Sequence, residues 1–119
     1  MGMENLYKEV MDLNMMDDDD QKREVAKTFF EKLNAMELPE YFNWAEEIFD
    51  GMHLKERADK TALLWSDIAT KEKQTYSYSE FAAKGNQCLN KIRGAGGDKG
   101  DNMYMMVSIV PETWFASYA

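Results

Sequence analysis

The feature that most constrains the fold of this chain is a continuous apolar run at residues 103–110, MYMMVSIV, followed by Pro111 and Glu112. Apolar residues at nearly every position are typical of a strand that is covered on both faces, as in a parallel sheet. Proline suits the first turn of a helix, where its missing N–H needs no partner. The sequence therefore predicts a buried strand at residues 103–110 and a helix beginning at Pro111.

This strand and helix predict a further strand that the sequence does not contain. A covered strand followed by a helix is half of a βαβ unit, in which a parallel partner strand comes next. No such strand follows within the 119 residues, and nothing comes after the helix to bury its aromatic residues, Trp114, Phe115 and Tyr118. We therefore expect the chain to be the front of a larger protein whose remainder carries the chemistry.

Apolar periodicity predicts helices in the first third of the chain. Two helical stripes are present: Leu6, Val10 and Leu13, then Val25, Phe29, Leu33 and Met36. Four aspartates, residues 17–20, precede the second stripe, where a helix N-terminus stabilises negative charge. Pro39 ends the segment. We interpret residues 1–40 as a helical N-terminal extension.

The middle of the chain predicts a helix, a β-hairpin and a second helix. Asn43 and Glu46 have the spacing of a capping box before a helix whose expected buried side chains are Trp44, Ile48, Phe49 and Met52. Two strand-like runs, residues 61–67 and 74–79, are separated by a short polar turn. Ser77 and Glu80 form another capping box, opening a helix with an apolar face of Phe81, Gly85, Cys88, Leu89 and Ile92. Gly94 and Gly96 are placed to end it in a left-handed cap.

Composition excludes several classes of function. The net charge is −8, from 22 acidic and 14 basic residues, which argues against sequence-independent binding to nucleic acid or anionic lipid. Cys88 is the only cysteine, so no internal disulfide can form and a reducing compartment is expected. The N-terminus lacks the pattern of a secretory signal, and no apolar run approaches the ~20 residues of a membrane helix. We expect a cytoplasmic protein.

No residue is retained as catalytic, cofactor-binding or metal-ligating. The stretch GAGGDKG follows a helix and precedes a strand, the reverse of a phosphate-binding loop, so a helix cap and turn is the preferred interpretation. The four aspartates lack the alternating pattern of a calcium loop. His53 is the only histidine and is expected in a surface or interface role. Cys88 is interpreted as a small buried hydrophobic residue, and Tyr76 and Tyr78 as strand and core residues.

From residue 41 onward the chain resembles the N-terminal portion of the AMP-forming adenylating enzymes, the superfamily of acyl-CoA synthetases, peptide-synthetase adenylation domains and luciferases. YFNWAEEIFD is similar to the opening of the medium-chain acyl-CoA synthetases, and RADKTALLW to the stretch before the first hairpin strand. YSYSEF takes the place of the first core motif, and KGDNMYMMVSIVPETWFASYA resembles a Gly-Asp-Arg-Val strand followed by Pro-Glu and an aromatic helix. Gly97 and Asn102 depart from this pattern and suggest a loosened turn.

The resemblance implies a mixed α/β fold: an incomplete piece of the large N-terminal domain of an adenylate-forming enzyme, occupying residues 41–119. The whole enzyme would convert a carboxylic acid, ATP and coenzyme A into acyl-CoA, AMP and pyrophosphate, with Mg²⁺. Its ATP-binding and catalytic motifs would lie beyond residue 119, so the chain alone is expected to be inactive. The expected partner is the remainder of the enzyme, or another copy of the chain. The alternative is an autonomous acidic interaction module, or a gene remnant, without enzymatic activity.

Overall fold

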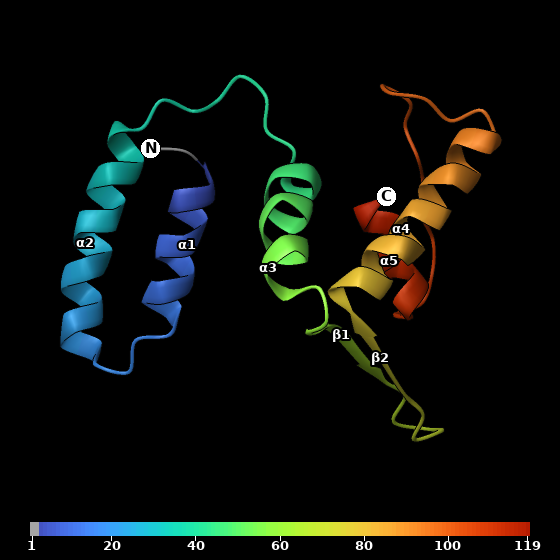
Figure 1. Cartoon of the computed structure of the whole chain (residues 1–119), viewed down its shortest axis with the longest axis horizontal. Helices are drawn as coiled ribbons and strands as arrows, with labels where there is room; N and C mark the ends of the chain where they lie inside the picture. The colour runs from blue at the N-terminus through green and yellow to red at the C-terminus, as the bar shows by residue number, and fades with distance from the viewer. Residues whose placement is uncertain (1–2) are drawn as a thin grey trace. The chain divides into compact units, whose positions relative to one another are not determined.

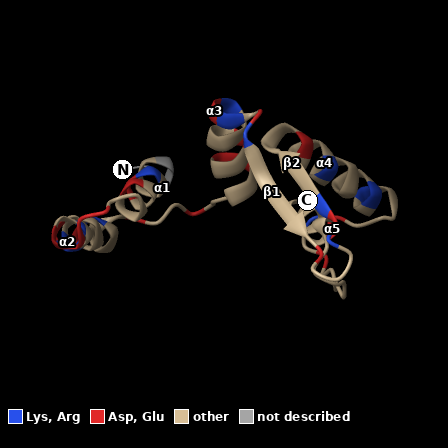
Figure 2. Ribbon diagram, turned by 90° about the horizontal axis from the view of Figure 1, so that it is seen from below, with Lys and Arg blue, Asp and Glu red and all other residues tan. Residues whose placement is uncertain are grey.

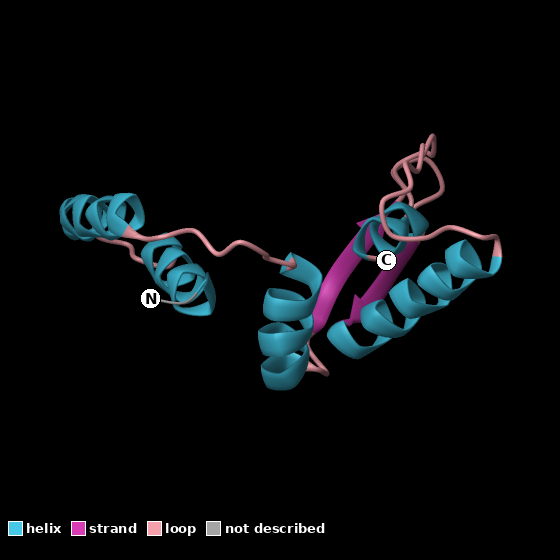
Figure 3. Cartoon of the chain, turned by 90° about the horizontal axis from the view of Figure 1, so that it is seen from above, coloured by secondary structure: helices cyan, strands magenta, loops and turns pink. Residues whose placement is uncertain are grey.

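The computed structural model describes residues 3–119, so the first two residues of the predicted N-terminal helix lie outside the described part. The chain divides into two compact units, Met1–Ile48 and Phe49–Ala119, which are described separately. The fold combines helices with a two-stranded antiparallel sheet, as Figures 1 and 3 show. The predicted mixture of helix and sheet is therefore confirmed.

The first unit contains the two predicted helices, α1 (Met3–Asn14) and α2 (Asp19–Ala35). Leu6 of α1 and Phe29 of α2 are buried apolar side chains of these two helices. Lys32 Nζ also lies 3.1 Å from the Glu9 carboxylate, linking the two helices. The aspartate cluster caps α2 as expected, because the Asp18 carboxylate accepts a hydrogen bond of 2.8 Å from the backbone N–H of Gln21.

The next helix begins with a π-helical segment, η1 (Ala45–Leu54), which runs directly into the short α3 (Lys55–Arg57). The Asn43 side chain caps it, accepting hydrogen bonds from the N–H groups of Ala45 and Glu46. The carboxylate that returns to the Asn43 N–H is that of Glu47, at 3.2 Å, so the predicted pairing with Glu46 is wrong. A π-helix has more residues per turn than an α-helix, which brings a later residue beneath the cap.

The buried side of η1 differs from the prediction at two residues. Ile48, Phe49 and Met52 are buried as expected. Trp44 is 46% exposed, because it lies at the N-terminal edge of the helix, ahead of the first buried turn. His53 was expected in a surface or interface role, but it is 4% exposed and belongs to the interior. The wider π-helical turn places it next to Met52 on the buried side.

The predicted hairpin is present as β1 (Thr61–Ser66) and β2 (Lys73–Ser77), paired antiparallel with Leu64 opposite Thr75. The Asp67 carboxylate organises the turn by accepting hydrogen bonds from the N–H groups of Ala69 (2.7 Å) and Thr70 (3.2 Å). These bonds lower the pKa of Asp67, because they favour the ionised carboxylate.

Helix α4 (Tyr78–Gly94) follows the hairpin directly and carries both predicted caps. The Ser77 hydroxyl accepts from the Glu80 N–H at 3.2 Å, and the Glu80 carboxylate accepts from the Ser77 N–H at 2.8 Å. At the other end Gly96 has a φ of +94°, and its N–H donates to the carbonyl of Arg93. The N–H of Gly97 donates to the carbonyl of Ile92, which completes a Schellman motif.

The glycine at position 97 fits a tight turn and not a loosened one. A Cβ atom there would lie 2.8 Å from Cγ2 and 3.1 Å from the carbonyl oxygen of Ile92. A side chain at this position would therefore require Ile92 to move. The expectation that Gly97 loosens the turn is wrong.

The predicted buried strand at residues 103–110 is not formed. This segment has no regular secondary structure and belongs to the long irregular loop near the C-terminus in Figure 3. Most of its side chains are exposed. A strand needs neighbouring strands for its backbone and covering layers for its side chains, and the described residues supply neither. One bond anchors the end of the segment: the Trp65 indole N–H donates to the Ile109 carbonyl at 2.8 Å.

The last helix, α5 (Pro111–Tyr118), begins at proline as predicted. The sequence showed nothing after the helix to bury its aromatic residues, but earlier parts of the chain bury two of them. Phe115 is buried and Tyr118 is half-buried, whereas Trp114 is 50% exposed. The core of this second unit is a cluster of buried side chains from η1, α4 and α5: Phe49, Phe81, Ala82 and Phe115.

Candidate functional site

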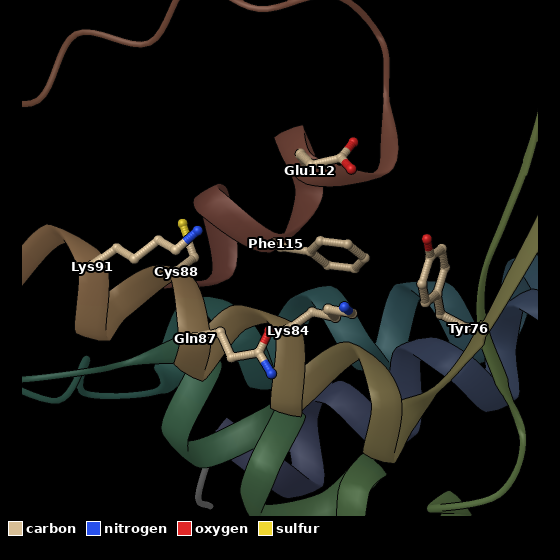
Figure 4. A pocket seen from close by; sticks show the side chains of 7 residues that line it. All are labelled: Tyr76, Lys84, Gln87, Cys88, Lys91, Glu112 and Phe115. Atoms are coloured by element: carbon tan, nitrogen blue, oxygen red, sulfur yellow. The ribbon is translucent and has the colours of Figure 1, made fainter.

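A cavity of about 250 Å³ lies between α4 and α5. Four residues of α4 line it: Lys84, Gln87, Cys88 and Lys91. Their spacing places them on one face of the helix, and Figure 4 shows them projecting from successive turns. The neighbouring face of α4, with Phe81 and Gly85, is buried in the core. The cavity therefore lies beside the core, at the border between buried and exposed faces of α4.

Two aromatic rings and a carboxylate complete the lining. Tyr76 of β2 and Phe115 of α5 stack edge to face with ring centroids 5.0 Å apart. The Tyr76 hydroxyl donates to the Gln74 side-chain oxygen at 2.7 Å, which fixes the ring. Glu112, in the first turn of α5, contributes the single carboxylate of the lining, opposite α4 in Figure 4.

This lining can bind a small molecule but is poorly arranged for covalent catalysis. A concave site with an aromatic surface and a few polar groups is typical of a ligand pocket. A cysteine nucleophile needs an adjacent base, and the only histidine of the sequence, His53, is not among the lining residues. The structure therefore does not bring His53 and Cys88 together.

A hydrogen bond between Tyr118 and Asp50 lies beside the aromatic core of the second unit. The Tyr118 ring packs on Phe49 with centroids 4.7 Å apart, and its hydroxyl donates to Asp50 Oδ1 at 2.5 Å. Burial raises the pKa of Tyr118 well above its usual value, and the hydrogen bond to the Asp50 carboxylate raises it further. Tyr118 is therefore a neutral hydrogen-bond donor that ties α5 to η1.

His53 lies against Tyr78, with ring centroids 5.4 Å apart. Burial lowers the pKa of His53 below its usual value, and the nearby Arg57 cation lowers it further, while Glu56 opposes them. The residue is therefore neutral at pH 7 and serves as part of the packed interior.

The remaining candidate motifs of the sequence form helix caps and turns. The glycines of GAGGDKG form the cap and turn after α4, and Asp18 of the aspartate cluster caps α2. Within residues 3–119 no group of three or more His, Cys, Asp or Glu side chains is placed to hold a metal ion. None of the described helices is both long and apolar enough to cross a bilayer.

Most of the cavity was not predicted from the sequence. Cys88 and Tyr76 were interpreted as core residues, and Glu112 and Phe115 only as part of the last helix. Lys84, Gln87 and Lys91 were not considered. The available signal was the helical spacing of the three polar residues of α4 immediately beside its apolar face. The contribution of α5 could not be found in this way, because it depends on how the two helices pack.

Comparison with known proteins identifies relatives over about 60% of the chain. The chain is 42% identical over 73 residues to 4-hydroxybutyrate–CoA ligase 1 of Metallosphaera sedula, a match that covers 61% of this chain. It is 31% identical over 67 residues to acetyl-coenzyme A synthetase of Xanthobacter autotrophicus, and 29% identical over 86 residues to a mitochondrial acyl-coenzyme A synthetase of Homo sapiens. No protein-family model matches the chain.

These relatives confirm the resemblance stated from the sequence: they are acyl- and acetyl-CoA synthetases. The matched regions span only 13%, 10% and 15% of the length of these three proteins.

Proposed function

We propose that this chain is a structural part of an AMP-forming acyl-CoA synthetase, and that it activates no acid by itself. The reaction of the whole enzyme joins a carboxylic acid to ATP, releases pyrophosphate, and transfers the acyl group to coenzyme A with loss of AMP. The observation that carries the proposal is the 42% identity over 73 residues to a CoA ligase. The match covers only 13% of that ligase. This supports the view that ATP, Mg²⁺ and coenzyme A bind to residues that this chain does not contain.

The exposure of residues 103–110 supports the proposal that another part of the same enzyme covers this segment. Several of its large apolar side chains are open to solvent, including Tyr104 (88% exposed), Met106 (83%) and Ile109 (83%). Such a segment has the composition of an inner strand, but no strand among residues 3–119 pairs with it. The matched CoA ligase has most of its length outside the matched region, enough to supply that neighbour. We therefore propose that the remainder of a CoA ligase adds the strands that cover residues 103–110.

A reconstitution experiment tests this function. The 119-residue chain is mixed with the portion of the Metallosphaera sedula ligase that lies outside the matched region. Pyrophosphate and acyl-CoA are then measured with 4-hydroxybutyrate, ATP, Mg²⁺ and coenzyme A. We expect neither piece alone to react and the mixture to form acyl-CoA. The matched control is a Phe115→Ala chain, whose core is disrupted and which should not reconstitute.

Two results would overturn the proposal. Acyl-CoA formation by the chain alone would show that it contains a complete active site. A mixture that neither associates nor reacts would remove the chain from this enzyme.

The second candidate function is an autonomous interaction module. The observation that favours it is the second unit's own aromatic core, which joins η1, α4 and α5 without any further chain. Cooperative thermal unfolding of a monomer at all concentrations would favour this candidate. Concentration-dependent association that the ligase portion relieves would favour the first.

A further inference from the structure

The helix that contains η1 is π-helical in its middle and α-helical at both ends. At its start the Glu47 N–H donates to the Asn43 carbonyl at 2.8 Å, a bond between residues four apart, as in an α-helix. Ala45–Leu54 is π-helical, with bonds between residues five apart, and α3 returns to the α-helical pattern. π-Helices are rare and occur mostly as single turns. The α-helical register is therefore a close competitor for these ten residues.

The N-terminus of this helix carries a carboxylate for each register. In the structure the Glu47 carboxylate accepts from the Asn43 N–H at 3.2 Å. Glu46 has the position that closes an α-helical capping box with Asn43, and among residues 3–119 its carboxylate is used in no hydrogen bond or ion pair. Figure 2 shows acidic residues along this helix and basic residues at its α3 end. The helix dipole therefore favours a carboxylate cap in either register.

His53 is the buried residue whose position depends most on the register. It follows the fully buried Ile48 by five residues, the spacing that the π-helical hydrogen bond brings into line. It is accordingly buried, against the Tyr78 ring of α4, with centroids 5.4 Å apart. In an α-helix, at about 100° per residue, His53 lies about 140° around from Ile48, whereas Met52 stays within about 40° of it. The α-helical register therefore exposes His53 and keeps Met52 buried.

The surroundings of His53 favour its neutral form. Tyr78 is the titratable group that faces it from α4, and Glu56 and Arg57 lie near it on its own helix. Burial lowers the pKa of His53, the Arg57 cation lowers it further, and Glu56 opposes both. A proton on His53 therefore destabilises the register that buries the imidazole relative to the register that exposes it.

We propose that η1 is a proton-operated switch between two helical registers. While His53 is neutral, its ring is buried, the helix is π-helical and Glu47 caps it. When His53 binds a proton, the hydrogen bonds re-form between residues four apart and Glu46 takes over the cap. His53 then leaves Tyr78 for the edge of the buried side. This switch is separate from the ligase reaction proposed above.

The test is an NMR measurement, at pH 7 and pH 5, of the couplings that pass through backbone hydrogen bonds in the 119-residue chain. At pH 7 the N–H groups of residues 50–54 should couple to the carbonyls five residues earlier. At pH 5 they should couple to the carbonyls four residues earlier, while the couplings within α4 persist. His53→Gln, which is neutral at both pH values, should keep the five-residue pattern at both.

Glu46→Ala and Glu47→Ala form a matched pair, because each removes one carboxylate from the same turn. Glu46→Ala weakens the α-helical cap, so it should lower the pH at which the pattern changes by about half a unit, a typical effect of a cap. Glu47→Ala weakens the π-helical cap, so it should raise that pH by a similar amount. An effect of net charge alone would move both variants in the same direction.

Four results would overturn the proposal. One is an identical hydrogen-bond pattern at pH 7 and pH 5 in the unsubstituted protein. Another is a shift in the same direction for the two alanine variants. A change of pattern in His53→Gln would show that a different group binds the proton. Loss of the couplings of η1 and α4 together at pH 5 would show unfolding of the whole unit, and not a change of register.

Discussion

Gly85 is the residue at which the packing of α4 on α5 is most restrictive. It is buried, and a Cβ atom at this position would overlap the ring of Tyr118. We expect Gly85→Ala to destabilise the protein by about 1–3 kcal/mol, because the ring must shift from its place between Phe49 and Phe81. Chemical denaturation measures this loss as a change in the free energy of unfolding.

The same helix provides a matched control for this substitution. Gly94 has open space around it, so Gly94→Ala should leave stability unchanged or raise it slightly. A second test combines Gly85→Ala with Tyr118→Ala, which removes the ring. The double variant should then lose less stability than the two single variants lose together. Equal losses at Gly85 and Gly94 would contradict the packing argument.

His53 makes stability depend on pH. Its pKa is lowered in the folded protein, so between that value and about 6.5 the unfolded chain binds the proton more tightly than the folded chain does. The free energy of unfolding should therefore fall as the pH drops below about 6.5. His53→Gln, which is neutral throughout, should unfold with a flatter dependence between pH 7 and pH 5. If the free energy of unfolding depends on pH in the same way in the two proteins, another group is responsible.

Among the elements, α4 depends most clearly on its caps. Ser77→Ala removes the hydroxyl that accepts the Glu80 N–H, and should cost about 0.5–2 kcal/mol of stability. Ser77→Asp retains an acceptor at the same position and should remain close to the unchanged protein. Thermal unfolding of the three proteins measures the difference. If the aspartate variant is as unstable as the alanine variant, the hydroxyl has a role other than capping.

The elements also show what the sequence can and cannot predict. The hairpin and the capping box at Ser77 were predictable because their hydrogen bonds join residues close in sequence. The strand at residues 103–110 was not, because apolar composition gives only a tendency, and pairing needs a neighbour from elsewhere. The cavity fell between these cases: the spacing of Lys84 and Lys91 on α4 was visible, but the position of Phe115 opposite them depends on tertiary packing.

For the whole molecule, the exposed segment at residues 103–110 should control self-association. An unpaired, apolar, strand-forming segment is a template for pairing between chains, so the isolated protein should associate as its concentration rises. Met106→Lys places a charge in the middle of the segment and should shift the protein toward monomer in size-exclusion chromatography and light scattering. Its melting temperature should not change, because Met106 is 83% exposed and outside the buried core.

The position of the added charge separates this explanation from a general effect of net charge. Asn102→Lys adds the same charge just outside the apolar run and should relieve association much less than Met106→Lys. If both substitutions act equally, the net charge of −8 controls solubility, and the segment does not. If the unsubstituted protein is already a monomer at every concentration, residues 103–110 need no partner. The interaction-module function would then be favoured over a place within a larger ligase.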